Sequence, residues 1–199
     1  MAKNLLMIFI KNQVEGNVKT RLGASIGSAN ALQVYKKLLN HTREVALQVS
    51  VDRQVWYSSM IDHRDSWSSD NFSKQLQKGA DLGERMSSAF ESAFDGGYSK
   101  VVIIGSDCFG LSHQHIEKAF QALEQHDTVI GPSKDGGYYL LGMKSYSPEL
   151  FNDIEWSTPQ VFDKTIEHFR SHDLSFKTLD VLNDIDTFED LRESNISLP

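Results

Sequence analysis

The segment 101–108 constrains the fold of this chain more than any other, because it reads Val-Val-Ile-Ile-Gly-Ser-Asp-Cys. Four consecutive apolar residues predict a strand that is buried on both faces, as parallel strands beneath helices are. Gly105 and Ser106 end this strand, so Asp107 is expected at its carboxyl edge. Ligands of open α/β sheets bind at that edge, and a carboxylate there is well placed to hold a divalent cation that bridges phosphates. The alternative interpretation is that Asp107 only caps a turn.

The composition favours a globular protein that handles a small ligand. The 199 residues are 40% hydrophobic and 24% charged and contain no linker-like tract, which predicts a single domain over residues 1–199. The formal net charge of −7 argues against nucleic acid as the main partner, but it is compatible with a local basic pocket for phosphates. The apolar run at residues 5–10 is too short for a signal peptide or a membrane span, so we expect a cytoplasmic protein.

Predicted strands and helices alternate along the chain. Apolar patterns predict strands at residues 5–10, 54–60, 101–105, 128–131 and 138–143. Helical spacing and capping residues predict helices at residues 29–42, 81–93 and 112–123, and another from Pro159 to about His172. The segment 62–74, rich in Ser, Asp and Asn, is expected to be an exposed loop. This alternation predicts an α/β fold with a mostly parallel sheet between helices.

A basic loop follows the first predicted strand. It contains Lys11, Lys19 and Arg21, together with Gly16 and Thr20, and so brings three cations to the edge where phosphates bind. It is neither a P-loop nor a dinucleotide-binding turn, because it lacks both glycine-rich signatures. We interpret it as a cradle for a diphosphate, with Lys19 and Arg21 exposed to a cleft beside the carboxylate that follows the 101–105 strand. The other interpretation is a solvated surface loop.

Two acidic segments could share this edge of the sheet. Asp135 lies between two predicted strands and is followed by Gly136 and Gly137, which would let the backbone pass close to a ligand. An ordinary hairpin turn explains the same residues. Asp184 and Asp186 belong to the run Asn-Asp-Ile-Asp-Thr at 183–187, part of which is a helix-capping pattern. Two residues apart in an extended stretch, they point the same way, so one or both could reach a metal.

Taken in order, these blocks resemble a bacterial glycosyltransferase family of the GT-A fold. The resemblance rests on residues 11–21, on Asp-Leu-Gly-Glu-Arg-Met at 81–86, and on the motifs that contain Asp107, Asp135 and Asp186. Members are often assigned to arsenosugar biosynthesis or to radical-SAM-associated gene clusters, and the Asp-Ile-Asp-Thr motif is similar to that of phospholactate and molybdenum-cofactor guanylyltransferases. The resemblance implies a three-layer GT-A, or nucleotide-diphospho-sugar transferase, fold. It implies the fold more firmly than the reaction.

The activity that the resemblance implies is metal-dependent glycosyl transfer from a nucleotide-diphospho-sugar to a small acceptor. Asp107 would hold Mg²⁺ or Mn²⁺ and Asp186 would share it, while the basic loop and the glycines at 136 and 137 would contact the donor. Asp135 would act as a base or contact the acceptor, and Trp156 would line the acceptor pocket. One alternative is a nucleotidyltransferase that uses a nucleoside triphosphate and releases pyrophosphate. Another is a nucleotide-sensing module without turnover.

The chain departs from the family pattern at two loops. A proline is expected after Cys108 and another soon after Lys11, whereas this chain has Phe109 at the first place and Asn12-Gln13 at the second. Proline stiffens a loop by fixing φ, so these departures put the loop geometry and the choice of substrate in question.

Overall fold

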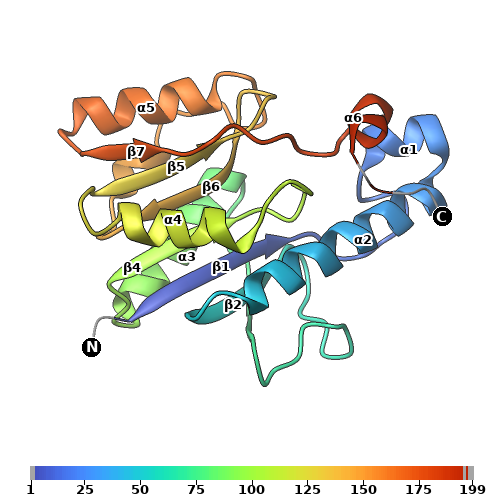
Figure 1. Cartoon of the computed structure of the whole chain (residues 1–199), viewed down its shortest axis with the longest axis horizontal. Coiled ribbons are helices and arrows are strands. Elements are labelled where there is room, and N and C mark those ends of the chain that lie inside the picture. The colour runs from blue at the N-terminus through green and yellow to red at the C-terminus, as the bar shows by residue number, and fades with distance from the viewer. Residues whose placement is uncertain (1–2, 195, 197–199) are drawn as a thin grey trace.

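A seven-stranded sheet forms the centre of the protein in the computed structural model, which describes residues 3–194 and 196 (Figure 1). The sheet order is β3-β2-β1-β4-β6-β5-β7, and β6 alone among the described strands runs antiparallel to its neighbours. The predicted α/β fold with a mostly parallel sheet is therefore confirmed. The strands are β1 (Asn4–Ile10), β2 (Asp52–Tyr57), β3 (Ser73–Leu76), β4 (Lys100–Ile104), β5 (Thr128–Pro132), β6 (Tyr138–Met143) and β7 (Phe176–Thr178).

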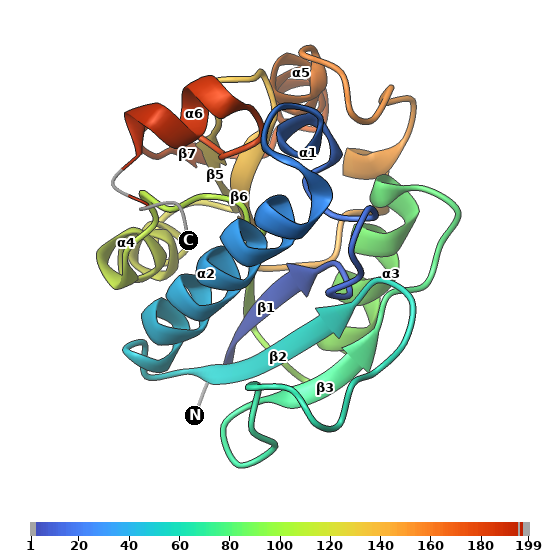
Figure 2. The same ribbon diagram turned by 90° about the vertical axis from the view of Figure 1, so that its right-hand side faces the viewer.

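Helices cover both faces of this sheet (Figures 1 and 2). One face packs against α2 (Ser28–Leu47) and α4 (His113–Ala122), and the other against α3 (Leu82–Asp95), the 3-10 helix η1 (Pro148–Phe151) and α5 (Val161–Ser171). Side chains alternate along a strand, so Leu6, Ile8 and Ile10 of β1 face the α2 side while Leu5 and Met7 face the α3 side. Burial on both faces explains why β1 is almost wholly apolar.

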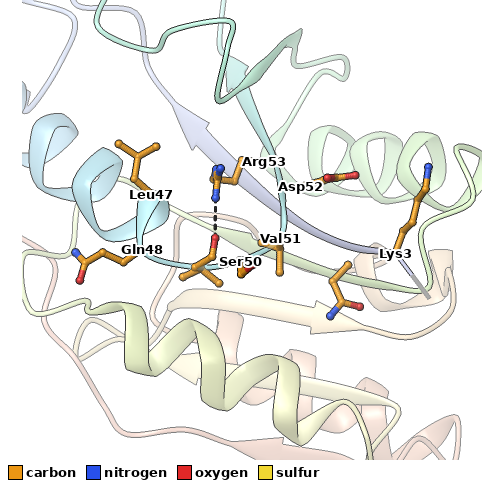
Figure 3. Close-up of a pocket in the computed structure, with 9 residues that line it drawn as sticks. Lys3, Leu47, Gln48, Ser50, Val51, Asp52 and Arg53 are labelled. Carbon is orange, nitrogen blue, oxygen red and sulfur yellow. Dashed lines mark hydrogen bonds between the residues drawn. The ribbon is translucent and has the colours of Figure 1, made fainter. Parts of the chain in front are cut away.

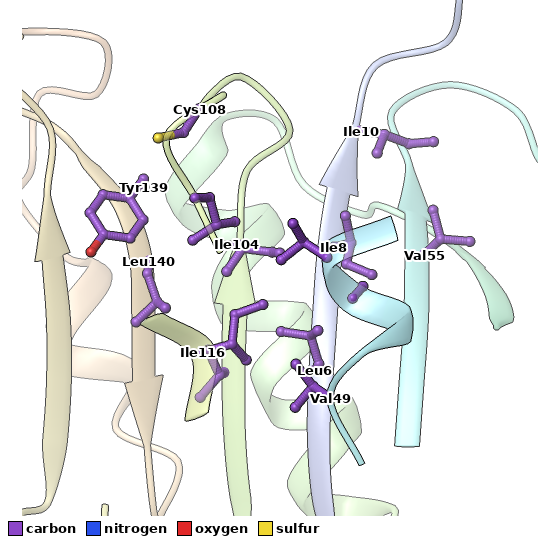
Figure 4. Packing of buried hydrophobic residues seen from close by; sticks show 14 of the residues in the cluster. Leu6, Ile8, Ile10, Val49, Val55, Ile104, Cys108, Ile116, Tyr139 and Leu140 are labelled. Atoms are coloured by element: carbon purple, nitrogen blue, oxygen red, sulfur yellow. The ribbon is translucent and has the colours of Figure 1, made fainter. Parts of the chain in front are cut away.

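The core beneath α2 and α4 supports the carboxyl ends of β1 and β4 (Figure 4). Ile8 and Ile104 are buried there with Ile116 from α4 and Tyr139 from β6. Cys108, which follows β4, is buried in the same cluster. Burial of each large aliphatic side chain contributes roughly 1.5–3 kcal/mol to stability. The loop that carries Asp107 is thus anchored in the core by Ile104 before it and by Cys108 after it.

Two short helices form a smaller cluster with α2 at the carboxyl end of the sheet (Figure 2). Leu22 of α1 (Thr20–Ile26) and Leu191 of α6 (Phe188–Glu193) are buried there with Leu38 of α2. Ile185 also points into this cluster, so the aspartates on either side of it are directed elsewhere. This packing brings the basic loop near the start of the chain beside the acidic motif near its end.

The structure corrects four details of the predicted elements. The second strand covers residues 52–57 rather than 54–60, and the helix expected from Pro159 begins at Val161. Ser157 has a φ of 65°, so the backbone is not yet helical there. The end of the predicted basic loop, residues 20–22, belongs to α1, which has only one buried residue, Leu22, and hence no apolar period. The segment 62–74 is not wholly exposed, because Trp67 is fully buried and β3 begins at Ser73.

None of the helices in the described part of the chain is long and apolar enough to cross a membrane.

Candidate functional site

The predicted site lies where the order of the strands reverses. From β1 the chain proceeds to β2 on one side, and later to β4 on the other side, so β1 and β4 are parallel neighbours at a topological switch point. Open α/β sheets bind ligands at the carboxyl ends of such strands. Lys11 follows β1 directly and Asp107 follows β4 by three residues, so both start from this edge.

Lys19 joins the two carboxylates that the sequence suggested as metal ligands. Its Nζ lies 2.7 Å from Oδ1 of Asp107 and 2.9 Å from Oδ1 of Asp186. Burial alone lowers the pKa of Lys19, but the two carboxylates outweigh burial and the pKa is raised. The expectation that Lys19 is well exposed is wrong, since only 3% of its side chain is accessible to solvent. Asp107 and Asp186 therefore face each other across one buried ammonium group.

Asp184 adds another carboxylate to this cluster. It is partly buried, and its backbone neighbour Ile185 donates its N–H to the Asp107 carbonyl at 3.0 Å. Burial, followed by the negative charge of Asp107, raises the pKa of Asp184 to about 7. By contrast Asp186, although burial opposes it, has a pKa held below its usual range by Lys19 and Arg21. Carboxylates packed this closely repel one another, and a cation relieves the repulsion.

The sequence reasoning names Asp184 as able to reach a metal together with Asp186, but assigns the shared metal to Asp107 and Asp186. It missed Tyr35 entirely, because this residue falls within the apolar face of α2. The Tyr35 hydroxyl accepts from the Lys11 N–H at 2.8 Å, donates to the Lys11 carbonyl at 3.1 Å, and lies 3.3 Å from the Ser106 hydroxyl. Tyr35 thus ties the end of β1 to the end of β4.

A pocket of about 100 Å³ opens beside this cluster. Arg21 reaches it with a side chain that is 69% exposed and ion-paired to Asp186. Pockets that enclose drug-sized ligands measure about 300–1,000 Å³, so this one can surround only part of a nucleotide. Its cations suit a phosphate group. The lining residues are Lys11, Val18, Lys19, Thr20, Arg21, Tyr35, Asp107 and Asp186.

The other residues predicted to contact the donor or the acceptor do not line this pocket: Gly16, Asp135, Gly136 and Gly137. Gly16 is exposed and has a φ of 79°, with nothing within 4 Å of a Cβ placed on it. Asp135 is exposed, and its Oδ1 accepts from the Ser133 hydroxyl at 2.5 Å and from the Gly137 N–H at 3.0 Å. The turn interpretation of this motif therefore accounts for one carboxylate oxygen. The charge of Asp135 nevertheless contributes to the raised pKa of Asp184.

Gly136 has a packing role that the hairpin interpretation did not include. Its φ is 88°, and a Cβ there would lie 2.1 Å from the carbonyl oxygen of Pro159. Its own carbonyl accepts from the N–H of Phe162 at 2.8 Å. The Asp-Gly-Gly turn is therefore fixed against the start of α5.

The two departures from the family pattern are compensated by other contacts. The Asn12 side chain accepts from the Ser59 N–H at 3.0 Å and the Ser59 hydroxyl at 2.9 Å, and it donates to the Met60 carbonyl at 2.7 Å. Phe109 packs against the His41 ring of α2, with 4.6 Å between ring centroids. Side-chain contacts thus hold both loops where the family pattern would use proline.

The Asp-Leu-Gly-Glu-Arg-Met block forms the start of α3, as predicted. The Asp81 carboxylate caps this helix by accepting from the Glu84 N–H at 2.9 Å. Trp156 lies against Gly83, where an added Cβ would be 2.2 Å from the indole Nε1. Trp156 therefore packs on a helix, partly buried, and does not belong to the pocket beside Lys19.

A larger hollow of about 570 Å³ lies at the opposite end of the sheet (Figure 3). It is lined by the end of α2, the connection to β2, the first residues of β2, and residues 3 and 4 at the start of β1. Arg53 is already engaged there, since it donates to the Val49 carbonyl at 2.6 Å and lies over the Phe72 ring. The Asp52 carboxylate accepts from the Tyr98 hydroxyl at 3.0 Å. The two charged side chains of β2 at this hollow, Asp52 and Arg53, are thus already held by contacts within the protein.

These features define an α/β protein of the fold shared by nucleotidyltransferases and GT-A-like proteins. More particularly, the chain belongs to the family described as "Uncharacterized protein conserved in bacteria (DUF2064)", which matches residues 40–158. The matched part contains Asp107 and Asp135 but neither Lys19 nor Asp186. No curated protein matches the sequence significantly.

Solved structures give closer comparisons. A "putative nucleotide-diphospho-sugar transferase" from Desulfovibrio desulfuricans G20 is 33% identical, with 99% of this chain and 90% of that chain covered and a TM-score of 0.90. A CMP:2-keto-3-deoxy-manno-octonic acid synthetase complexed with CTP is 11% identical, with 96% of each chain covered and a TM-score of 0.60. A Mycobacterium tuberculosis H37Rv protein complexed with manganese is 12% identical, with 96% and 97% covered and a TM-score of 0.59. The last two comparisons support the fold alone.

Proposed function

We propose that this protein is a transferase that acts on a nucleotide donor with the help of a divalent cation. The observation that carries the proposal is the convergence of Asp107 and Asp186 on Lys19 at the switch point, beside a pocket that Arg21 also lines. Carboxylates and cations side by side match a metal–diphosphate ligand, which presents both positive charge and negative oxygens. A surface loop without function does not require a buried lysine between two carboxylates.

The donor set fits Mg²⁺ or Mn²⁺. Asp107 and Asp186 would hold the ion and Asp184 adjoins them, and carboxylate oxygens are the ligands that these hard cations prefer. The raised pKa of Asp184 marks a surplus of negative charge that such an ion would neutralise. When bound, the ion supplies charge stabilisation to phosphate oxygens. Among the described residues no three His, Cys, Asp or Glu side chains are grouped so that they could hold a metal ion. The ammonium group of Lys19 lies between Asp107 and Asp186 instead.

Within this class we favour glycosyl transfer from a nucleotide-diphospho-sugar, as in the name of the 33% identical relative. An acceptor oxygen would attack the anomeric carbon, and the bond from that carbon to the diphosphate oxygen would break, releasing a nucleoside diphosphate. Lys19 and Arg21 would stabilise the departing charge. Asp135 would take the acceptor proton through Oδ2, which accepts no hydrogen bond from the described residues, while Oδ1 is held by the turn.

Nucleotidyl transfer is the second candidate, because the same cations also suit the phosphates of a triphosphate donor. Lys11, Lys19 and Arg21 all come from the segment that directly follows β1 and converge on one phosphate-sized pocket. Such a cluster suits the charge that develops when an acceptor phosphate attacks the α-phosphorus of a triphosphate and pyrophosphate leaves. The two candidates therefore share the site and differ in the bond that breaks.

The released product decides between the candidates. We would screen nucleoside triphosphates and sugar nucleotides by thermal shift with Mg²⁺ or Mn²⁺, because a ligand of the folded state raises the melting temperature. The best ligand would then be incubated with alcohol and phosphate acceptors. Release of nucleoside diphosphate supports glycosyl transfer, and release of pyrophosphate supports nucleotidyl transfer instead. Binding without any product would support nucleotide sensing.

The matched variants are Asp107→Asn and Asp163→Asn. We expect the first to abolish metal-dependent nucleotide binding while the fold persists, because Asp107 is partly exposed at the strand edge. Asp163 is exposed on α5, so its replacement should leave the thermal shift unchanged. Equal thermal shifts in Asp107→Asn and the unmodified protein would contradict the proposed site.

A further inference from the structure

Lys19 occupies the position that a shared metal ion would take. Its ammonium group contacts one oxygen of Asp107 and one of Asp186, within 2.9 Å of each, and it is almost completely shielded from solvent. Two carboxylate oxygens within hydrogen-bond distance favour the charged ammonium form of Lys19. The acidic pair is therefore already neutralised in part by a cation that belongs to the chain.

The backbone of Lys19 is held in an unfavourable conformation. Its φ of 50° and ψ of 45° are left-handed, a conformation that is unfavourable for a residue with a side chain. Lys19 is also the residue that precedes α1, and its carbonyl accepts from the Gly23 N–H at 2.7 Å. The two ion pairs offset this strain, so the conformation of Lys19 depends on its carboxylate partners.

A divalent cation and this ammonium group cannot share the same two oxygens without strong repulsion. For the metal to bind, the ammonium must move, and moving it away from anions is costly in a buried place. A phosphate in the adjoining pocket, which Lys19 itself lines, provides the anion that such a movement requires. The lysine can then exchange a carboxylate partner for a phosphate partner while the metal takes over the carboxylates.

We propose that Lys19 is a built-in counter-ion that keeps divalent metal out of the site until nucleotide phosphates draw it away. The inference rests on the proposed function of this site as a metal–nucleotide site. It makes the binding of metal and nucleotide mutually dependent: each ligand tightens the other by the same factor. Metal alone binds weakly, and the site assembles its metal only together with the donor.

The test measures the affinity of Mn²⁺ alone, by electron paramagnetic resonance of the free ion, for the full chain and four variants. Lys19→Met and Lys19→Gln remove the charge, and we expect each to bind Mn²⁺ about tenfold or more tightly than the unmodified protein. Lys19→Arg keeps the charge and should stay near the unmodified affinity. Lys74→Met is the matched control, because Lys74 is also buried, with 7% of its side chain exposed, and is paired with Asp65 at 2.7 Å in another part of the fold.

The second measurement adds inorganic pyrophosphate as the phosphate probe. Pyrophosphate should tighten Mn²⁺ binding to the protein with Lys19 more than to Lys19→Met, after correction for the Mn²⁺–pyrophosphate complex in solution. Circular dichroism and thermal unfolding establish that each variant is folded, and Lys19→Gln serves if the methionine variant is not.

The outcomes separate this inference from the proposed function. Unchanged or weaker Mn²⁺ affinity in both uncharged Lys19 variants overturns the counter-ion role, even if the unmodified protein turns over a nucleotide. Conversely, if no nucleotide binds to the unmodified protein, the proposed function fails, while the Mn²⁺ comparison still decides whether Lys19 excludes metal. An equal gain in Lys19→Arg would also overturn the inference, since the effect would not follow charge.

Discussion

Replacing glycine by alanine should have opposite effects on stability at Gly83 and at Gly23. Both glycines lie in helices, where alanine is intrinsically favoured by up to about 1 kcal/mol. At Gly23 an alanine Cβ would have 3.6 Å to its nearest neighbour, which is ordinary contact. At Gly83 the Cβ would lie 2.2 Å from Nε1 and 2.4 Å from Cε2 of Trp156, so the indole ring must move.

The difference between the two variants measures the cost of this displacement. Overpacking of this kind costs typically about 1–3 kcal/mol, which exceeds the gain from helix propensity. We therefore expect Gly83→Ala to lower the free energy of unfolding by about 1–2 kcal/mol and Gly23→Ala to raise it by up to about 1 kcal/mol. In a chain of this length each kcal/mol corresponds to a shift of about 2–4 °C in melting temperature.

The assay is urea unfolding followed by tryptophan fluorescence, to which Trp156 contributes together with Trp56 and Trp67. A double-mutant cycle with Trp156→Ala isolates the contact, because removing the indole ring should remove the penalty of Gly83→Ala. If Gly83→Ala proves as harmless as Gly23→Ala, or if its penalty persists without the indole ring, the packing argument is wrong.

Three further predictions concern the site and its supports. Tyr35→Phe removes the hydroxyl that is hydrogen-bonded to both backbone groups of Lys11. It should lower the free energy of unfolding in urea by about 1–3 kcal/mol and weaken nucleotide binding in a titration, and full retention of affinity would refute the positioning role of Tyr35. The pKa of Asp184 is raised to about 7, so between pH 4 and 7 the folded state holds a proton that the unfolded state has released. The free energy of unfolding should therefore fall as pH rises from about 4 to about 7. Asp184→Asn should remove this fall in urea unfolding at several pH values with a chelator present, and an unaltered slope would contradict the shift. Gly136→Ala should lower the free energy of unfolding by about 2–4 kcal/mol, because the new Cβ would collide with the Pro159 backbone. A Cβ at Gly16 would have no neighbour within 4 Å, so Gly16→Ala should cost only the left-handed penalty of about 1–2 kcal/mol. Equal losses of stability in the two variants would count against the close approach at Gly136.

Elements with a strong local signal were predicted closely. The apolar run at 101–105 corresponds to β4 at Lys100–Ile104, and β6 has the predicted bounds, Tyr138–Met143. Asp81 correctly predicted the start of α3, because a carboxylate that precedes a helix accepts a hydrogen bond from a free backbone N–H of its first turn. By contrast β3 reads Ser-Lys-Gln-Leu at the edge of the sheet, where no alternation distinguishes a strand from a loop.

Most members of the candidate site were predictable from the sequence, but Tyr35 and the arrangement of the residues were not. Asp107 and Lys11 follow strands, so their shared edge could be derived from topology. The burial of Lys19 could not, because lysine is almost always exposed unless it is paired, and its partner Asp186 lies 167 residues further along the chain. The small cluster around Leu22 and Ile185 brings these distant segments together.

The contact between Asn12 and the loop at residues 58–60 changes the way in which the basic loop is stiffened. A proline would restrict the unfolded chain and make this loop rigid on its own. Asn12 instead acts only in the folded state, through hydrogen bonds to Ser59 and Met60 that vanish when the neighbouring loop departs. The two loops therefore share one opening event, and their backbone amides should exchange with solvent at rates set by a single local unfolding free energy.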